Sequence, residues 1–349
     1  MKHFLLPEKN DTMHYYRANL HCHSTISDGS KTVEELKRDY MAHGYSAIAF
    51  TDHDIYLTHN ELTDESFVAL NGYELEVTQD DPPEGESAKT AHVCLVALEQ
   101  DNDKAVCYHR TKYIGDKSSQ YRTMINFDDR LPDFERVYTP ECVNEIIKTA
   151  KENGFFVTYN HPTWSLESYP EYSAFRGMDA MEIQNFSSVV SGWDDDNGHC
   201  YEDLLRQGNR LYAVAADDNH NRHDDDDPHC DSYGGYVMIA ADELKYEKLT
   251  SSLKNGTFYA STGDYKKSGP EILSLEYEDG QVRIKTTPAR YIAVTHNTRN
   301  CSSAYAKDGE SVIEAVFNID KNAKWFRLTV IDNQGFKAYT RAYFLDELK

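Results

Sequence analysis

The chain has 349 residues, of which 40% are hydrophobic and 27% are charged, a composition typical of a soluble globular protein with room for two domains. Its formal net charge of -23 argues against general nucleic-acid binding and against anionic membrane surfaces, because both need a surplus of Lys and Arg. No apolar run approaches the ~18 residues of a membrane span, and the first residues do not resemble a signal peptide. The seven cysteines form no CxxC pair, which argues against a disulfide framework. We therefore expect a cytoplasmic protein, whose oligomeric state the sequence leaves open.

The first predicted elements alternate between strand and helix. Residues 16–20 form a short strand candidate that leads into His21. Thr32 opens a capping box, which predicts a helix that begins there and ends at Gly44. Residues 45–51 then form an apolar strand that ends at an Asp-His-Asp sequence. Strand, helix and strand within about 35 residues are typical of a βαβ unit.

The same pattern recurs further along the chain. Thr139 and Pro140 predict the start of a second helix, which runs to about Gly154. Further short apolar strands are predicted at 67–70, 92–98, 155–159, 180–183 and 211–216. This alternation indicates an α/β fold with a parallel sheet, most simply a barrel.

Two segments depart from this alternation. Residues 99–138 are polar and have few apolar runs, so we expect an insertion that lies over one face of the barrel. Between 272 and 331, short alternating runs separated by turn signals predict a small antiparallel β-sandwich. We therefore divide the chain into a barrel domain (1–265) and a small β domain (270–349).

Imidazole and carboxylate groups recur near the ends of the predicted strands. Such groups are the ligands that zinc, manganese and iron take, and the order of metal affinities alone does not choose among these ions. In barrels, the carboxyl ends of the strands carry the site, so ligands far apart in the sequence are expected to converge there. One His alone is as often structural as functional, but nine candidates together suit about three ions that share a bridging carboxylate. The candidates are His21, His23, Asp28, His53, Glu74, His92, His161, Asp218 and His220.

The motifs that carry these residues occur in a characteristic order. They are His21–Ser24, Ser27–Gly29, Thr51–Asp54, Gly72–Glu74, His161–Pro162 and Asp218–His220. In order and spacing they resemble the PHP family (polymerase and histidinol phosphatase), over roughly residues 14–262. The resemblance implies a distorted seven-stranded (β/α) barrel with a trinuclear metal site. The C-terminal segment resembles, more weakly, a β-sandwich appended in a branch named for a carbamate hydrolase.

The resemblance also implies how the ligands are shared among three divalent ions. The first ion would take His21, His23, Glu74 and Asp218. The second would share Glu74 and add His92 and His161, and the third would take Asp28, His53 and His220. Members of that family include phosphoesterases, so the reaction that the resemblance implies is hydrolysis of a small phosphorylated metabolite, with a nucleotide as one option. A hydroxide that bridges two ions would attack the phosphorus, and the third ion would hold phosphate oxygens.

Further catalytic roles are assigned by position. Asp52 is expected to orient a ligand imidazole from behind. The candidates for phosphate binding are Arg17, Arg176, Arg222 and His223. For the general acid, the candidates are a metal-bound water, His199 and His223.

Two other functions remain open. A metal-dependent hydrolase of a carboxylic ester, carbamate or lactone would use the same ligands without a phosphate clamp, so an apolar pocket wall without Arg would favour it. A binding protein would use the 270–349 domain to hold a glycan or a protein, beside a barrel that has lost its activity.

Overall fold

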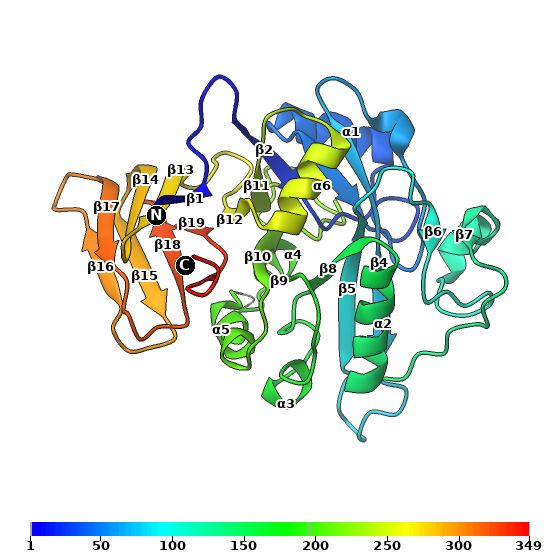
Figure 1. Ribbon diagram of the computed structural model, residues 1–349. Coiled ribbons are helices and arrows are strands. Elements are labelled where there is room, and N and C mark those ends of the chain that lie inside the picture. The colour runs from blue at the N-terminus through cyan, green and yellow to red at the C-terminus, as the bar shows by residue number, and fades with distance from the viewer. Residues whose placement is uncertain (1, 195, 349) are drawn as a thin grey trace.

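Nine strands between residues 14 and 262 lie side by side in one large mixed sheet (Figure 1). The computed structural model describes residues 2–194 and 196–348. Along the sheet the strands follow the order β10-β9-β8-β5-β4-β3-β2-β11-β12. In that order, their bounds are Tyr212–Ala216, Ala180–Asn185, Phe155–Tyr159, Thr90–Ala97, Val68–Thr78, Ala47–Phe50, His14–Asn19, Gly235–Ala241 and Phe258–Thr262.

The strand directions correct the expected parallel sheet. Strands β2, β3 and β4 are parallel to one another, as are β8, β9 and β10. Strand β5, however, is antiparallel to both β4 and β8, and β11 is antiparallel to β2. No helix separates β4 from β5, and two adjacent strands joined by a short loop must run in opposite directions. The fold is therefore mixed α/β.

The sheet curls, so that β11 comes against the end of β10. At Gly235, the first residue of β11, a Cβ atom would lie 2.2 Å from the carbonyl oxygen of Ala216. Only glycine permits this close approach. The curl brings the carboxyl end of β10 toward that of β2, which is the end that carries the predicted ligands.

Two helix starts that the sequence predicts are confirmed. Helix α1 (Val33–Ala42) follows a complete capping box at Thr32, and α2 (Pro140–Glu152) follows the N-cap Thr139. The remaining helices are α3 (Tyr169–Tyr172), α4 (Phe186–Val190), α5 (Gly198–Arg206) and α6 (Tyr246–Asn255). Among residues 2–194 and 196–348, none of the helices combines the length and the apolar character that crossing a bilayer requires.

The predicted insertion at 99–138 contains little regular structure. It holds the short parallel pair β6 (Lys104–Ala105) and β7 (Asn126–Phe127), with the 3-10 helix η2 (Asp116–Met124) between them. In Figure 1 it lies at the edge of the molecule farthest from the β region, beyond β4 and α2.

The C-terminal β region contains two sheets. One has the order β1-β13-β14-β17, and the other continues the large sheet from β12 through β19, β18, β15 and β16, with β20 beside β18. Their bounds are Lys2–Leu6 (β1), Ile272–Glu278 (β13), Gln281–Ala289 (β14), Tyr291–His296 (β15), Ser302–Tyr305 (β16), Val312–Asn318 (β17), Trp325–Ile331 (β18), Lys337–Tyr339 (β19) and Tyr343–Phe344 (β20). The N-terminal strand β1 therefore belongs to this region, because it pairs with β13, although the predicted barrel domain begins at residue 1.

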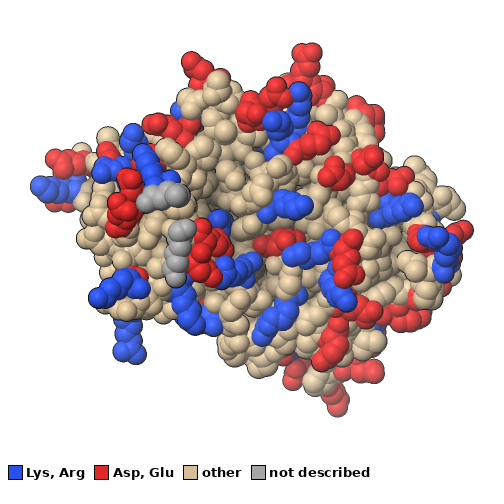
Figure 2. Space-filling view, in the orientation of Figure 1, with Lys and Arg blue, Asp and Glu red and all other residues tan. Residues whose placement is uncertain are grey.

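Apolar side chains from both sheets of the β region share one buried cluster. Leu275 and Ile284 of the first sheet belong to the same cluster as Ile292 and Leu328 of the second, and all four are fully buried. Lys and Arg are interspersed with Asp and Glu over the molecular face that Figure 2 shows, which is the surface expected around such cores.

Candidate metal centre

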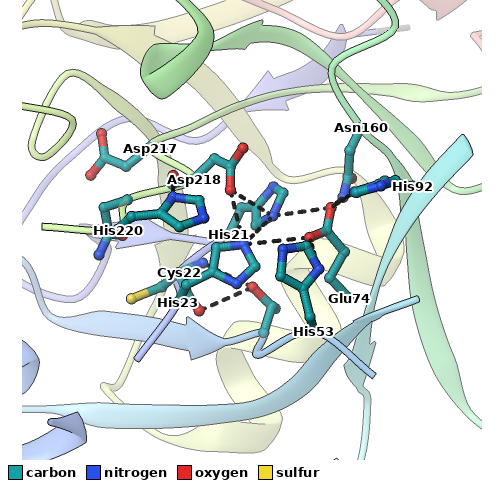
Figure 3. A network of polar contacts seen from close by, with 12 residues as sticks. His21, Cys22, His23, His53, Glu74, His92, Asn160, Asp217, Asp218 and His220 are labelled. Carbon is teal, nitrogen blue, oxygen red and sulfur yellow. Dashed lines mark hydrogen bonds and ion pairs between the residues drawn. The ribbon is translucent and has the colours of Figure 1, made fainter. Parts of the chain in front are cut away.

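The structure brings all nine predicted ligands together at one end of the large sheet. Figure 3 labels seven of them: His21, His23, His53, Glu74, His92, Asp218 and His220. The nine predicted ligands come from segments far apart in the sequence: the ends of β2, β3, β8 and β10, and the interiors of β4 and β5. Most of these side chains are buried, so they are held among other protein atoms and not in bulk water.

The tightest group contains the ring nitrogens of His21 and His23 and the carboxylates of Glu74 and Asp218. His21 Nε2 lies 3.1 Å from His23 Nε2, 3.2 Å from Glu74 Oε1 and 3.1 Å from Asp218 Oδ1. His23 Nε2 lies 2.9 Å from Asp218 Oδ1 and 3.4 Å from Glu74 Oε2. Ligand atoms around a tetrahedral ion with bonds of about 2.0–2.1 Å lie roughly 3.3 Å apart. The group therefore has the spacing of one coordination shell.

Glu74 lies at the centre of the whole cluster. Its Oε1 is 3.0 Å from His92 Nδ1 and 3.3 Å from His161 Nε2, and its Oε2 is 3.1 Å from His53 Nδ1. A carboxylate with both oxygens near several imidazoles is suited to bridge two ions.

The third predicted group is more open. His220 Nε2 lies 3.2 Å from Asp28 Oδ2, whereas His53 Nε2 and His23 Nδ1 lie 3.9 Å and 3.8 Å from Asp28 Oδ1. The imidazole of His23 stacks with that of His53 and with that of His220, at centroid distances of 4.3 Å and 4.6 Å. Asp28 and these imidazoles form one compact set of four possible ligands.

Three buried atoms of the cluster have no hydrogen-bond partner among the described residues: His53 Nδ1, Glu74 Oε2 and His92 Nε2. The first two lie 3.1 Å apart, but that contact does not have the geometry of a hydrogen bond. Buried polar atoms are normally hydrogen-bonded, because an unsatisfied one costs about 1–3 kcal/mol. Nitrogen and oxygen atoms that lack such partners suit divalent cations, so the residues present fit the metal site that their sequence motifs imply.

The charges within the cluster are strongly coupled. Burial lowers the pKa of His23, but Asp218 and Glu74 outweigh this effect and raise it to about 10. Burial likewise opposes the effect of Glu74 and Asp218 on His161, whose pKa rises to about 9. Conversely, burial raises the pKa of Glu74, yet His21 and its neighbours hold it well below the ordinary value. Without metal, the cluster thus holds protons that a bound cation would displace.

Several ligands depend on unusual backbone geometry. Asp218 lies in the left-handed region at φ +53°, which Asp tolerates better than most residues. A Cβ atom at Gly29 would lie 2.4 Å from the carbonyl oxygen of His23, so the turn that carries Asp28 requires glycine. Such strain is typical of functional sites.

The structure also shows residues behind the ligands that the sequence does not reveal as functional. Glu182 Oε1 lies 2.7 Å from His21 Nδ1, and its Oε2 accepts hydrogen bonds from the His161 backbone N–H and from Asn185. Asn160 donates a 2.7 Å hydrogen bond to Glu74 Oε1. These contacts fix the orientation of ligand side chains. The one sequence signal for Glu182 is a charged residue inside a short apolar strand.

Asp52 acts differently from the expectation. Its carboxylate accepts four hydrogen bonds, from the backbone N–H and hydroxyl of Ser24 (both 2.8 Å) and from the N–H and hydroxyl of Ser27 (3.0 and 2.6 Å). Within residues 2–194 and 196–348 it makes no hydrogen bond to an imidazole, because Ser27, whose hydroxyl is 3.5 Å from His23 Nδ1, lies between Asp52 and His23. Asp52 therefore shapes the turn that carries Asp28.

Three of the positional candidates lie away from the ligand cluster. The guanidinium of Arg176 donates to the carbonyls of Ser173 and Phe175, and Arg176 is not among the described residues that line the cavity over the candidate ligands. Its catalytic role stays a prediction that its position does not support. Arg17 is enclosed between the rings of Tyr45 and Tyr236 and donates to a backbone carbonyl. The side chain of His199 is 86% exposed and lies next to Asp203.

A cavity of about 550 Å³ opens over the ligands. Arg222, His223 and His229 line it, and Arg222 Nη2 lies 3.2 Å from Asp28 Oδ2. The indole of Trp164 lines it as well and packs edge-to-face against His161 and His92, with centroid distances of 5.0 and 5.5 Å. The cavity therefore combines one guanidinium and two imidazoles at its rim with the exposed aromatic surface of Trp164.

No family model matches the sequence, and no curated protein matches it. Among solved structures, a two-domain protein from Bacteroides vulgatus, described as containing an expected PHP-like metal-dependent phosphoesterase, is similar over 97% of this chain and 98% of its own (13% identity, TM-score 0.42). A protein from Bifidobacterium adolescentis, named as a candidate metal-dependent phosphoesterase, is similar over 59% and 88% (15% identity, TM-score 0.36). An amidohydrolase from Chromobacterium violaceum, with bound sulfate and no metal, is similar over 58% and 87% (17% identity, TM-score 0.34). At these TM-scores, the function of this chain has to be inferred from its own side chains.

Proposed function

We propose that this chain is a PHP-type metal-dependent phosphoesterase that hydrolyses a small phosphorylated metabolite at a site for three divalent ions. The observation that carries the proposal is the set of nitrogen and oxygen atoms 2.9–3.4 Å apart around Glu74, which has the spacing of a coordination shell. Zinc, manganese and iron all suit this ligand set.

The charge of the loaded site favours an anionic substrate. Three divalent ions would bring six positive charges, against the five carboxylates that line the cavity: Asp28, Glu74, Glu76, Asp218 and Asp231. Arg222 adds a positive charge at the rim. The cavity would thus remain positive, although the protein as a whole carries a formal charge of -23.

When bound, divalent ions lower the pKa of water and polarise phosphoryl oxygens. The residues of the chain position the ligands and the substrate. Glu74 lies between the imidazoles of His92 and His53 and contacts both, and Asp231 fixes His220 by accepting a hydrogen bond from its backbone N–H at 2.7 Å. Arg222 lies where it can hold a phosphate oxygen, and His223 lies on the rim, where it can give a proton to the leaving oxygen.

The residues at the rim of the cavity also help to choose between a phosphoesterase and the alternative hydrolase. A hydrolase of carboxylic esters, carbamates or lactones has no need for a cationic side chain beside its metals, whereas the guanidinium of Arg222 lines this cavity, with the imidazoles of His223 and His229 as further groups that can donate hydrogen bonds to a phosphate. We therefore prefer a phosphoester substrate. Trp164, next to two ligands, offers a surface for the organic part of that substrate.

A substrate panel tests the proposal. Protein loaded separately with zinc, manganese and iron is assayed on p-nitrophenyl phosphate, bis-p-nitrophenyl phosphate and p-nitrophenyl acetate, beside the Glu74→Gln variant. We expect metal-dependent release of p-nitrophenol from a phosphoester and at least a ~10³-fold loss in the variant, since the bridging ligand is gone. Acetate hydrolysis with no phosphoester turnover would support the alternative.

A further inference from the structure

The last residues of the 99–138 insertion reach under the metal ligands. Arg136 Nη1 lies 2.5 Å from Asp54 Oδ1 and donates a 2.8 Å hydrogen bond to the carbonyl of Glu76. The side chains of Arg136 and Asp54 are only 5% and 4% exposed. This ion pair is thus deeply buried, although Arg136 comes from a segment with little regular structure.

Both partners of Arg136 adjoin metal ligands. Asp54 follows His53 directly, and Glu76 lies two residues beyond Glu74 in β4. The N–H of Asp54 donates to the carbonyl of Glu74 at 2.8 Å, and Asp54 lies in the left-handed region at φ +57°. The guanidinium therefore holds together two segments that each carry a ligand.

A second contact, two residues later, reaches another ligand segment. The hydroxyl of Tyr138 donates a 2.8 Å hydrogen bond to Glu167 Oε1, and the hydroxyl of Tyr159 donates one to Glu167 Oε2. The backbone N–H of Glu167 donates to the carbonyl of Pro162, which directly follows His161. Tyr138 is therefore linked through one buried carboxyl group to the turn that carries His161.

The rest of the insertion holds this segment in place. The ring of Tyr113 lies under the guanidinium of Arg136 at 4.2 Å, and its hydroxyl accepts a hydrogen bond from the Arg136 backbone N–H at 2.8 Å. A buried ion pair adds little net stability, because the desolvation of its charges offsets their attraction, but it can fix one arrangement of the chain. These contacts are thus suited to setting geometry.

We propose that residues 136–138 form a strap by which the insertion positions His53, Glu74 and His161 for metal binding. Arg136 and Tyr138 are positioning residues, since neither touches the ligand side chains and both act on the segments that carry them. The inference rests on the proposed metal centre. It gives the insertion a specific role, which is retention of the ions whose ligands lie nearest to His53 and His161.

The rate at which the protein releases metal tests the role of the strap directly. Wild type, Arg136→Met and Tyr138→Phe are loaded with zinc, and the transfer of zinc to the indicator 4-(2-pyridylazo)resorcinol is followed over time, beside metal analysis of each protein. The matched control is Arg130→Met, because Arg130 pairs with Asp128 inside the same insertion and is 83% exposed. Tyr138→Phe keeps its ring and removes one hydroxyl, so it preserves the fold even if Arg136→Met disturbs it.

We expect part of the zinc to leave about 10- to 100-fold faster from Arg136→Met and several-fold faster from Tyr138→Phe, with Arg130→Met unchanged. Release curves for both strap variants that match wild type would overturn the inference while leaving the metal centre intact. A wild-type protein that takes up none of zinc, manganese and iron would instead contradict the proposed function.

Discussion

The metal end of the large sheet and the C-terminal β region differ in where their charged side chains lie, because most are buried in the first and most are exposed in the second. In the β region, buried positions are mainly aliphatic and aromatic, and ion pairs such as Arg283–Glu314 lie at the surface with half-exposed side chains. At the metal end, histidines and carboxylates are buried together, and some of their atoms lack hydrogen bonds. Burying charge is unfavourable, so its concentration at one end of one region indicates a function and not a contribution to stability.

Among the variants that separate the two regions, the largest effect on metal affinity is expected at Glu182. The Glu182→Gln variant removes the charge behind His21 Nδ1 while keeping the shape of the side chain. Zinc affinity should fall about 10- to 100-fold, because such supporting contacts fix the orientation of a ligand. Competition for zinc with a chelator of known affinity measures the zinc affinity of each protein. Unchanged affinity would show that Glu182 has only a structural role.

A smaller effect is expected at Trp164, which lines the cavity without acting as a ligand. For a substrate with an aromatic organic group, the Trp164→Ala variant should raise KM about 3- to 10-fold, through loss of ring contact, while kcat falls less. Trp164→Phe should recover most of the difference. Equal KM values for wild type and Trp164→Ala would exclude this surface from substrate binding.

The pH dependence of stability provides a test at Glu167. Burial raises the pKa of this carboxyl group to about 8, against roughly 4.3 in an unfolded chain. Between these values the folded protein keeps a proton that the unfolded chain has lost, so stability falls as the pH rises through this window and levels off above it. Denaturant midpoints measured at pH 5, 6, 7 and 8 should therefore decline less in Glu167→Gln than in wild type.

Glu152→Gln is the control for that series, because the Glu152 side chain is 64% exposed at the end of α2. It should follow wild type at every pH. If Glu167→Gln also follows wild type, Glu167 is not held as the protonated acid in the folded protein.

The smallest effect is expected in the β region. Removing the exposed Arg283–Glu314 pair with Arg283→Gln should change the free energy of unfolding by less than about 0.5 kcal/mol. Metal content and turnover should stay at wild-type levels. A marked loss of either would show that the two regions are coupled, contrary to the contrast described above.

The sequence predicted local features better than long-range ones. Thr32 and Thr139 reveal their helix starts because capping is a local interaction, and the nine ligands stand out because His and Asp follow apolar runs. The pairing of β1 with β13 joins residues about 270 positions apart, and no local pattern records it. Strand β11 and helix α6 were also not predicted, although both help to build the sheet and its cover.

Within the site, the convergence of the candidate ligands was predictable from the sequence, whereas the residues that support them were not. Glu182 and Asn160 act through partners that only the fold brings near them. Asp52 was recognised as a supporting residue, but its partners turned out to be the hydroxyls and N–H groups of a turn. Arg176 was named by its position in the sequence alone, and in the structure nearby backbone carbonyls accept hydrogen bonds from its guanidinium.

Counting divalent ions per chain is the most direct test of the proposed site for three metal ions. Purified protein is saturated with zinc, manganese or iron, freed of loosely bound metal and analysed for its elements, and the same sample is assayed on a phosphoester before and after chelation. We predict about three ions per chain and turnover that disappears on chelation and returns when metal is restored. Less than one ion per chain, or full turnover in the chelated protein, would show that the histidine and carboxylate cluster is not a catalytic metal centre.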